Sequence, residues 1–466
     1  MKITELFATG RSVDEIITDL KKKSINVPSW DTLRREYDPN LHDVMDPVKR
    51  PNKKVKGKPD EPVSRITLKL QQLAVKRMAE FMFALPVKRI YKTEDDKVKQ
   101  EIAKALEAIY TSSRIDTLNL SRARAYFASC EIATLWYVVP SKNTTYGFES
   151  QYKLRCKTYS PMDGYKLYPL FDNYGDMIAF SVGYSRKEED RTINYFESWT
   201  DTAHYLWSDA KSGWAEVEDP YAIQLAKIPL VYGWRSEAIY AGLTNIVSEI
   251  EFTLSRNSDV IAYNAAPVLE VRGDVDRLED KGETRRVWRV TGDNGGIRYV
   301  SWEQAIAAIE FQVDQLMKFF WAQLQMPDLS FESIKGLGNV SGEARKTLLT
   351  DAHLKVGDEK GMFVEFFDRE CNIIKAYLKE MNTKWAKAID ELEVEHVITP
   401  FIQNDEAAEI DKLTKANGGK AVLSQLDSIK QLGWSTDPKA TLDQIQAEER
   451  ETAKNNATTD LFPITE

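Results

Sequence analysis

The chain has 466 residues, of which 42% are apolar and 29% are charged, and its formal net charge is −9. This length suffices for two or more cores, and the composition is that of a soluble globular protein rather than a disordered one. No apolar run reaches the roughly 18 to 20 residues that span a bilayer, and the acidic balance argues against tight DNA binding, in which Lys and Arg neutralise phosphates.

Residues 1–65 begin with short helical pieces and end in a proline-rich stretch from Pro47 to Pro62. Six basic residues crowd between these prolines: Lys49, Arg50, Lys53, Lys54, Lys56 and Lys58. A run of like charges among prolines is typical of a solvated, mobile arm. Contact of this stretch with DNA or with a neighbouring subunit is the alternative.

Residues 66–242 combine helices with strands. Apolar residues at helical spacing predict helices over 66–83, 97–112 and 114–130. Runs rich in β-branched and aromatic residues then predict strands at 132–139, 177–184 and 193–199, and a hairpin of 205–207 with 213–215. We interpret the many aromatic residues as β-core and cross-strand packing rather than as a base-stacking surface.

Two amphipathic helices flank a short β-rich segment. The first covers 243–264, with Leu243, Val247 and Ile250 on its apolar stripe, and the second covers 303–325. Between them, strand-like runs alternate with glycines, at 267–271, 286–290 and 297–300. We expect the strand edges of so small a segment to be completed by neighbouring subunits.

The second helix is predicted to end at Met326-Pro327-Asp328, because proline lacks an amide hydrogen and disfavours helical geometry in the residue before it. A glycine-containing loop follows. Ser341 is then the predicted N-cap of a very long helix, which Gly357 and Gly361 weaken enough to kink.

The C-terminal part is predicted to be mostly helical. Residues 394–400 favour a strand. Residues 404–452 contain acidic helical segments between glycine and Asp-Pro breaks, at 406–416, 423–432 and 441–449. We expect residues 455–466 to be disordered or to act as a docking tail.

The sequence carries no recognisable catalytic motif. It lacks the GxxxxGK[ST] phosphate loop, and the glycine-rich run 336–342 misses the GxGxxG spacing and follows a helix, which argues against a bound dinucleotide. The four histidines are scattered, and the three cysteines are widely separated, which predicts reduced thiols. We therefore expect no enzymatic activity, no cofactor and no metal.

Several short motifs resemble, in order and spacing, those of the phage portal protein family, the ring at the capsid vertex through which double-stranded DNA is packaged. In that family an aromatic-rich helix ends at a Pro-Asp segment, a tunnel loop follows, and Ser-Gly-x-Ala opens a long helix. The corresponding residues are Phe319-Phe320-Trp321, Pro327-Asp328 and Ser341-Gly342-Glu343-Ala344. Upstream, Lys227-Ile228-Pro229-Leu230-Val231 resembles the strand before the family's first stem helix. The resemblance covers most of the chain.

The resemblance implies an α+β portal fold with an α+β wing, a two-helix stem, a small β-rich clip, a long kinked helix and a helical crown. The implied boundaries are an N-terminal arm 1–65, the first part of the wing 66–242, a stem helix 243–264, the clip 265–301, a stem helix 302–326, the tunnel loop 327–340, the long helix and returning wing strand 341–403, the crown 404–452 and a flexible tail 453–466.

The resemblance also implies a function. The chain would form a ring, dodecameric in the virion, that is assembled in the bacterial host cytoplasm and forms the channel for DNA packaging and ejection. The implied partners are other copies of the chain, the terminase large subunit, the major capsid and scaffolding proteins, a head-tail adaptor, and double-stranded DNA passing through, with no membrane.

Two alternatives remain open. The first is a DNA-processing enzyme or another minor protein of phage head assembly, which the missing nucleotide loop, the missing metal cluster and the acidic balance disfavour. The second is an ordinary multidomain host protein that forms no ring.

The acidic balance suits a channel, because a weakly repelling wall lets a duplex slide where tight phosphate contacts would hold it. Glu249, Glu310 and Asp314 lie off the apolar stripes and are the candidates for this lining. In the loop 327–340, Lys335 is the only cation and would grip phosphates weakly. Ser330 and Asn339 would add uncharged hydrogen bonds to phosphate. Ordinary solvation of the loop is the alternative for Lys335.

Overall fold

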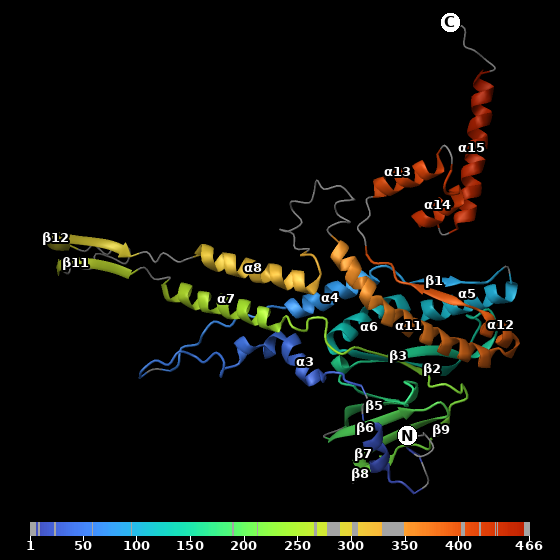
Figure 1. Ribbon diagram of the computed structural model, residues 1–466, viewed down its shortest axis with the longest axis horizontal. Coiled ribbons are helices and arrows are strands. Elements are labelled where there is room, and N and C mark those ends of the chain that lie inside the picture. Colours follow the sequence, from blue (N-terminus) through green and yellow to red (C-terminus); the bar gives the residue numbers. More distant parts are fainter. Residues whose placement is uncertain are drawn as a thin grey trace. The chain divides into compact units, whose positions relative to one another are not determined.

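Figure 1 shows the computed structural model of the chain. The structure describes residues 6–7, 10–22, 25–57, 59–94, 96–188, 191–211, 213–264, 268–276, 289–300, 306–328, 349–401, 406–418, 421–433, 435 and 437–460. The chain divides into two units, the first made of residues 1–328 and 351–401 and the second of residues 329–350 and 402–466.

Short helices near the N-terminus are packed into the first unit. They are α2 (Val13–Leu20), α3 (Trp30–Tyr37), η1 (Pro39–Leu41) and η2 (Asp43–Met45). Ser12 and Ser29 cap α2 and α3, each accepting a backbone N–H with its side-chain oxygen. Ile17 and Leu20 of α2 are buried in a cluster with Phe196 and other residues of a β-sheet. The short helical pieces predicted for this part of the chain are therefore confirmed.

Three longer helices follow: α4 (Leu70–Phe83), α5 (Lys97–Ser112) and α6 (Ile115–Ser129). The last two lie where the periodicity predicts them. α4 begins at Leu70 and not at the predicted Ile66. The backbone N–H groups of Ile66 and Leu68, before the helix, are bonded to side chains of a distant helix.

Antiparallel strands form two sheets. They are β2 (Glu131–Asn143), β3 (Ser150–Tyr159), β4 (Lys166–Phe171), β5 (Met177–Glu188), β6 (Arg191–Trp199), β7 (Ala203–Lys211), β8 (Gly213–Glu216), β9 (Tyr221–Ala222) and β10 (Leu230–Trp234). One sheet has the order β10-β2-β3; the other has the order β4-β5-β6-β7-β8, with β9 paired to β7. The predicted hairpin is confirmed, since Ser208 pairs with Ala215, whereas β3 and β4 were not predicted.

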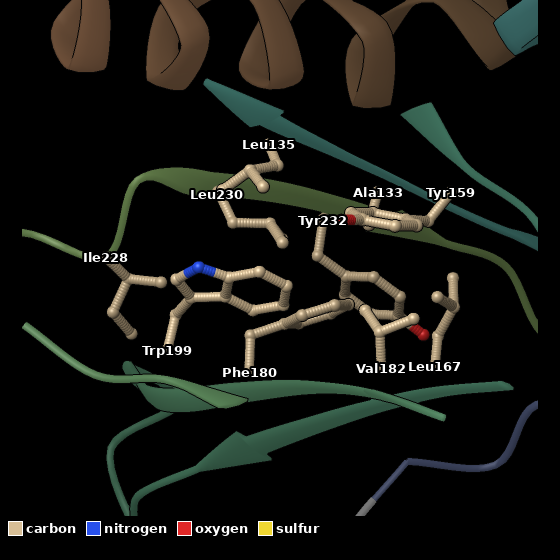
Figure 2. Close-up of a cluster of buried hydrophobic side chains, with 10 residues drawn as sticks. All are labelled: Ala133, Leu135, Tyr159, Leu167, Phe180, Val182, Trp199, Ile228, Leu230 and Tyr232. Carbon is tan, nitrogen blue, oxygen red and sulfur yellow. The ribbon is translucent and has the colours of Figure 1, made fainter. Parts of the chain in front are cut away.

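A core of buried side chains lies between these two sheets (Figure 2). Leu135, Leu230 and Tyr232 from one sheet face Phe180 and Trp199 from the other. The rings of Phe180 and Tyr232 have their centroids 5.3 Å apart, a spacing at which tilted aromatic pairs attract each other. The interpretation of the aromatic residues as β-core packing is confirmed for this cluster.

The two predicted amphipathic helices and the β-rich segment between them are present. The elements are α7 (Thr244–Asn264), β11 (Val268–Asp276), β12 (Arg289–Val300) and α8 (Ile306–Leu324). β11 and β12 form an antiparallel pair whose register shifts between Arg272 and Asp274, so Gly273 stands at an irregularity that suits glycine. β12 joins the described end of the predicted run 286–290, from Arg289, to the run 297–300, and it contains three of the glycines that lie between these runs. Residues 286–288 lie outside the described residues.

The long helix α11 (Thr350–Met381) leads into a short returning strand. The elements after it are η4 (Thr383–Trp385), α12 (Ala386–Glu391) and β13 (Val394–Val397). α11 runs without interruption through Gly357 and Gly361, and its predicted start at Ser341 lies outside the described residues. β13 pairs antiparallel with β1 (Lys88–Tyr91), a strand that was not predicted.

The second unit contains α13 (Glu406–Asn417), α14 (Gln425–Leu432) and α15 (Pro438–Asp460). Gly433 ends α14 with a left-handed φ of 73°, which glycine adopts readily. Pro438 opens α15, where a missing amide hydrogen costs nothing. Because α15 continues to Asp460, the prediction of disorder from residue 455 is wrong as far as 460, and 461–466 lie outside the described residues. None of the described helices is long and apolar enough to cross a membrane.

Candidate functional site

The paired helices α7 and α8 carry the hairpin β11–β12 between them, and Figure 1 shows them side by side. The fully buried apolar residues of α7 include Val247 and Ile250, in its first half, whereas those of α8 include Phe320 and Leu324, in its second half. Burial of such a side chain contributes about 1.5–3 kcal/mol. Since the helices are consecutive and their buried ends adjoin the rest of the unit, they are anchored at the ends remote from the hairpin.

A segment that we call the strap, residues 36–68, lies along α7. Three side chains on α7, spaced four residues apart and therefore on one stripe, accept its backbone N–H groups. The bonds join the Leu68 N–H to Glu251 Oε1 (2.7 Å), the Ile66 N–H to Ser255 Oγ (2.9 Å) and the Ser64 N–H to Asp259 Oδ1 (2.7 Å). Two residues of extended chain advance about 6.6 Å and four residues of helix about 6.0 Å, so the two periods nearly match.

The same stripe of α7 holds a buried histidine of the strap. His42 Nδ1 lies 2.8 Å from Glu251 Oε1, and His42 Nε2 lies 2.9 Å from the Glu36 carbonyl oxygen. Burial lowers the pKa of His42, but these two acceptors outweigh burial and leave the pKa raised. Because both ring nitrogens face acceptors, the imidazolium form, which donates from both, fits this position.

The three hydrogen bonds between the strap and α7 form what we call the ladder, and Asp259 accepts the bond at its outer end. Arg50 donates from Nη2 to Asp259 Oδ2 (2.7 Å) and from Nε to the Ser64 carbonyl oxygen (2.8 Å). Burial raises the pKa of Asp259, yet the Ser64 N–H and the Arg50 charge lower it by more, so its pKa lies below the usual value. Arg50, which the sequence assigned to a mobile arm, is therefore fixed.

The three acidic residues predicted to line a tunnel are all exposed, but they do not share one side of the helix pair. Glu249 lies beside α8, where Gln312 Nε2 donates to its Oε1 at 3.5 Å. Glu310 and Asp314 each stand two positions from Gln312, and at about 100° per residue they point roughly 160° away from it. If one face of the helix pair is directed at a channel axis, that face therefore carries either Glu249 or the pair Glu310 and Asp314, but not all three residues.

The three residues predicted for the tunnel loop, Ser330, Lys335 and Asn339, lie outside the described residues. The loop itself, predicted over 327–340, is described only at its beginning, Pro327 and Asp328.

A second buried polar cluster, which the sequence analysis missed, joins α6, α11 and β2. Arg122 donates to both carboxylate oxygens of Glu370, at 2.6 and 3.2 Å, and Trp136 Nε1 donates to Glu370 Oε1 at 2.9 Å. Arg122 is 0% and Glu370 1% exposed. A bidentate guanidinium–carboxylate pair of this kind satisfies both charges inside a core. The residues involved give no pattern in the sequence, because they are 248 positions apart.

A cavity of about 750 Å³ lies between the sheet β10-β2-β3 and the C-terminal end of α11. Aromatic rings line it, among them Trp199, Tyr221 and Tyr377, together with Glu197 and Glu380. No histidine, cysteine or aspartate is among the described residues that line it. Nor does any group of three or more His, Cys, Asp and Glu in the described part of the chain have an arrangement that could hold a metal ion.

The comparisons with known proteins bear on nearly the whole chain. A family model described as phage portal protein, SPP1 Gp6-like, matches residues 19–455. The match includes the strap, the paired helices, α11 and most of the second unit. Among curated proteins, none matches the sequence.

Proposed function

Because the chain belongs to the family of phage portal proteins, SPP1 Gp6-like, we propose that it is the subunit of a dodecameric portal ring at the capsid vertex. Membership of this family implies a homo-oligomeric ring, a channel for DNA at that vertex and a structural rather than an enzymatic role. The single observation that carries the proposal is the match over residues 19–455, a range that includes the helix–hairpin–helix unit from α7 to α8.

In this proposal α7 and α8 form the stem, the hairpin β11–β12 forms the clip, and α13 to α15 form the crown. The sheets β2 to β10, with α4 to α6 and the returning strand β13, form the wing. What supports the clip is that, among the described strands, β11 and β12 pair only with each other. Within the described residues each strand therefore has one edge that no other described strand pairs with, and a neighbouring copy or an adaptor would complete it by strand addition.

The proposed partners follow the two stages of head assembly. The ring docks the terminase large subunit while DNA is packaged and afterwards docks a head-tail adaptor, and it is incorporated together with the major capsid and scaffolding proteins. DNA passes through in both stages, inward in packaging and outward in ejection.

The proposed tunnel combines a weakly repelling wall with a loop that carries one cation per subunit. We assign the side of the stem that carries Glu249 to the wall, since Glu310 and Asp314 point away from it. Repeated around the ring, even one carboxylate per subunit gives a continuous acidic band, which opposes tight phosphate contacts. Lys335, with Ser330 and Asn339, would touch the passing phosphates from the loop.

Packaging by rings that carry Lys335→Ala tests this function. We expect the variant ring to assemble normally and to package less DNA per unit time, because each subunit loses its weak phosphate contact. Lys335→Arg, which keeps the charge, is the matched control and should package at the normal rate. The rate is measured as DNA protected from nuclease inside proheads, and a normal rate for the alanine ring would contradict the role given to Lys335.

A further inference from the structure

α8 presents an acidic and aromatic surface on the side turned away from α7. Phe311 is 66% exposed, and Glu310 and Asp314 on either side of it are exposed too. These three residues lie within about 100° of one another around the helix. Aromatic residues are enriched at the centre of protein–protein interfaces, with polar residues around them, and Phe311 with its acidic neighbours has this composition. Lys318 also stands on this side, so the described surface keeps an excess of one negative charge.

The strap presents the complementary chemistry in what we call the basic loop, residues 48–62. Val48 is 87% exposed, and Lys54 and Lys56 are exposed as well. Asp60 and Glu61 are also exposed, so the five described basic residues of the loop exceed its acidic residues by three. The loop is nevertheless held in place. Its two arms exchange backbone hydrogen bonds between Lys53 and Glu61, at 3.0 and 2.9 Å. Near its start, Arg50 is held by its bonds to Asp259 and to the Ser64 carbonyl oxygen. An apolar and basic surface is therefore presented at a defined place.

The strap, α7 and α8 form a row, and these two surfaces lie on its two outer sides. The strap is bonded to α7 at Glu251, Ser255 and Asp259, which stand about 160°, 120° and 80° around the helix from Glu249, the residue that α8 contacts. The strap thus crosses α7 on a different side from α8, and Figure 1 shows α7 between the blue strap and α8. The order is strap, α7, α8, and the outer faces of the row differ in charge.

We propose that in the ring the acidic face of α8, residues Glu310, Phe311 and Asp314, packs against the basic loop of the next copy of the chain. This inference rests on the proposed function, which supplies a second copy on each side. A row with unlike ends joins its neighbours head to tail, and such a heterologous contact closes into a ring when the rotation per subunit fits. Phe311 supplies the apolar centre of the contact, and Lys54 and Lys56 meet the two carboxylates.

The contact also gives Glu310 and Asp314 a role between subunits in place of the predicted role in the tunnel wall. The strap then does two things at once. Its inner side, through His42 and the N–H groups of Ser64, Ile66 and Leu68, holds α7 of its own copy. Its outer side holds α8 of the neighbour.

Charge reversal in the full chain tests the proposal. One variant carries Glu310→Lys with Asp314→Lys, and the other carries Lys54→Glu with Lys56→Glu. We expect each alone to form about tenfold fewer rings than the unchanged protein at equal concentration, because like charges then meet at every contact. A 1:1 mixture should form rings again, since alternating copies place lysine opposite glutamate at every contact.

The ring fraction is read by native mass, and the urea midpoint of each variant checks that it folds. Asp443→Lys with Glu449→Lys in α15, exposed residues with the same change in charge, is the control and should assemble normally. The inference is overturned if each variant assembles as the unchanged protein does, or if the mixture assembles no better than its components. If the unchanged chain forms no ring at all, the proposed function fails, and this contact fails with it.

Discussion

At the scale of single residues, buried charged groups join parts of the chain that are far apart in sequence. His42 and Glu251 are 209 positions apart, and Arg122 and Glu370 are 248 apart. A charge taken out of water is tolerated only when a partner and hydrogen bonds compensate it. Removing one member of such a pair leaves the other buried and unpaired, so these positions are the ones where a single substitution should cost most.

Arg122→Ala should lower the free energy of unfolding of the isolated subunit by about 3–5 kcal/mol, because Glu370 would stay buried without its partner. Glu365→Ala is the control. Glu365 accepts a bond from Arg369 on the same helix α11, but this pair is exposed, and its loss should cost at most about 0.5 kcal/mol. Urea unfolding followed by tryptophan fluorescence measures both, and equal losses would contradict the account.

His42 should make the stability of the strap depend on pH. Its pKa in the folded chain is raised above the ordinary 6.5, so its stabilising effect is complete below that value and is lost as pH rises through the folded pKa. The groups responsible are Glu251, the Glu36 carbonyl and the more distant Asp38.

The measurement is the difference in urea midpoint between the unchanged protein and His42→Gln, taken at about pH 5.5 and about pH 9. The difference isolates His42 from the other histidines. It should be large at the lower pH and shrink at the higher one, and a difference that is constant or grows with pH would contradict the assignment.

At the scale of elements, the ladder between the strap and α7 decides how the N-terminal part is held. Asp259→Ala removes the acceptors of both the Ser64 N–H and Arg50. At about 1.5–3 kcal/mol for hydrogen bonds to a charged group, local opening of the basic loop should become about tenfold more frequent or more. Trypsin should then cleave after Lys54 and Lys56 correspondingly faster.

Glu249→Ala is the matched control for this measurement, since Glu249 is an exposed carboxylate on the same helix but on the side of α8. Its cleavage rate should stay that of the unchanged protein. Equal acceleration in the two variants would show that the ladder does not restrain the loop.

Much of the element pattern could be predicted from local sequence. Helices α5, α6, α7 and α8 follow apolar spacing, and the break at Gly433 placed the end of α14. α15, predicted over 441–449, is longer at both ends. Strands β1, β3, β4 and β9 were missed. β1 is four residues long, and its partner β13 lies about 300 positions later, so no local pattern marks it. α4 was predicted four residues too long, since the apolar spacing continues into residues 66–69, which instead lie before the helix and are bonded to α7.

The candidate site was predicted less completely, for a physical reason. Glu251, Ser255 and Asp259 form a polar stripe along α7. The sequence pattern of such a stripe is the same whether its side chains are hydrogen-bonded to water or to another segment of the chain. The basic residues of the strap were likewise predicted to be mobile, although Arg50 is bonded twice. The sequence offers one signal for this contact. Polar residues at every fourth position of α7 match every second residue of the extended segment 64–68, and this match is visible only when the two segments are compared with each other.

At the scale of the whole molecule, the match over residues 19–455 implies a homo-oligomeric ring, in which we propose that the helix–hairpin–helix from α7 to α8 forms stem and clip. The exposed aromatic residue on α8, the edges of β11 and β12 that no other described strand pairs with, and the basic loop are surfaces that the described part of a single copy leaves uncovered. Each gains a partner when copies surround an axis. Assembly of several copies would explain why one chain exposes several such surfaces, because each surface is covered only when a neighbouring copy or another partner is present.

The native mass of the purified full-length chain, together with negative-stain images of the same sample, tests the central claim most directly. The account predicts annular particles of about a dozen subunits with a central hole, as a closed heterologous assembly requires. A chain that forms no ring would contradict it, and a monomer that hydrolyses ATP or cuts DNA would do so most strongly.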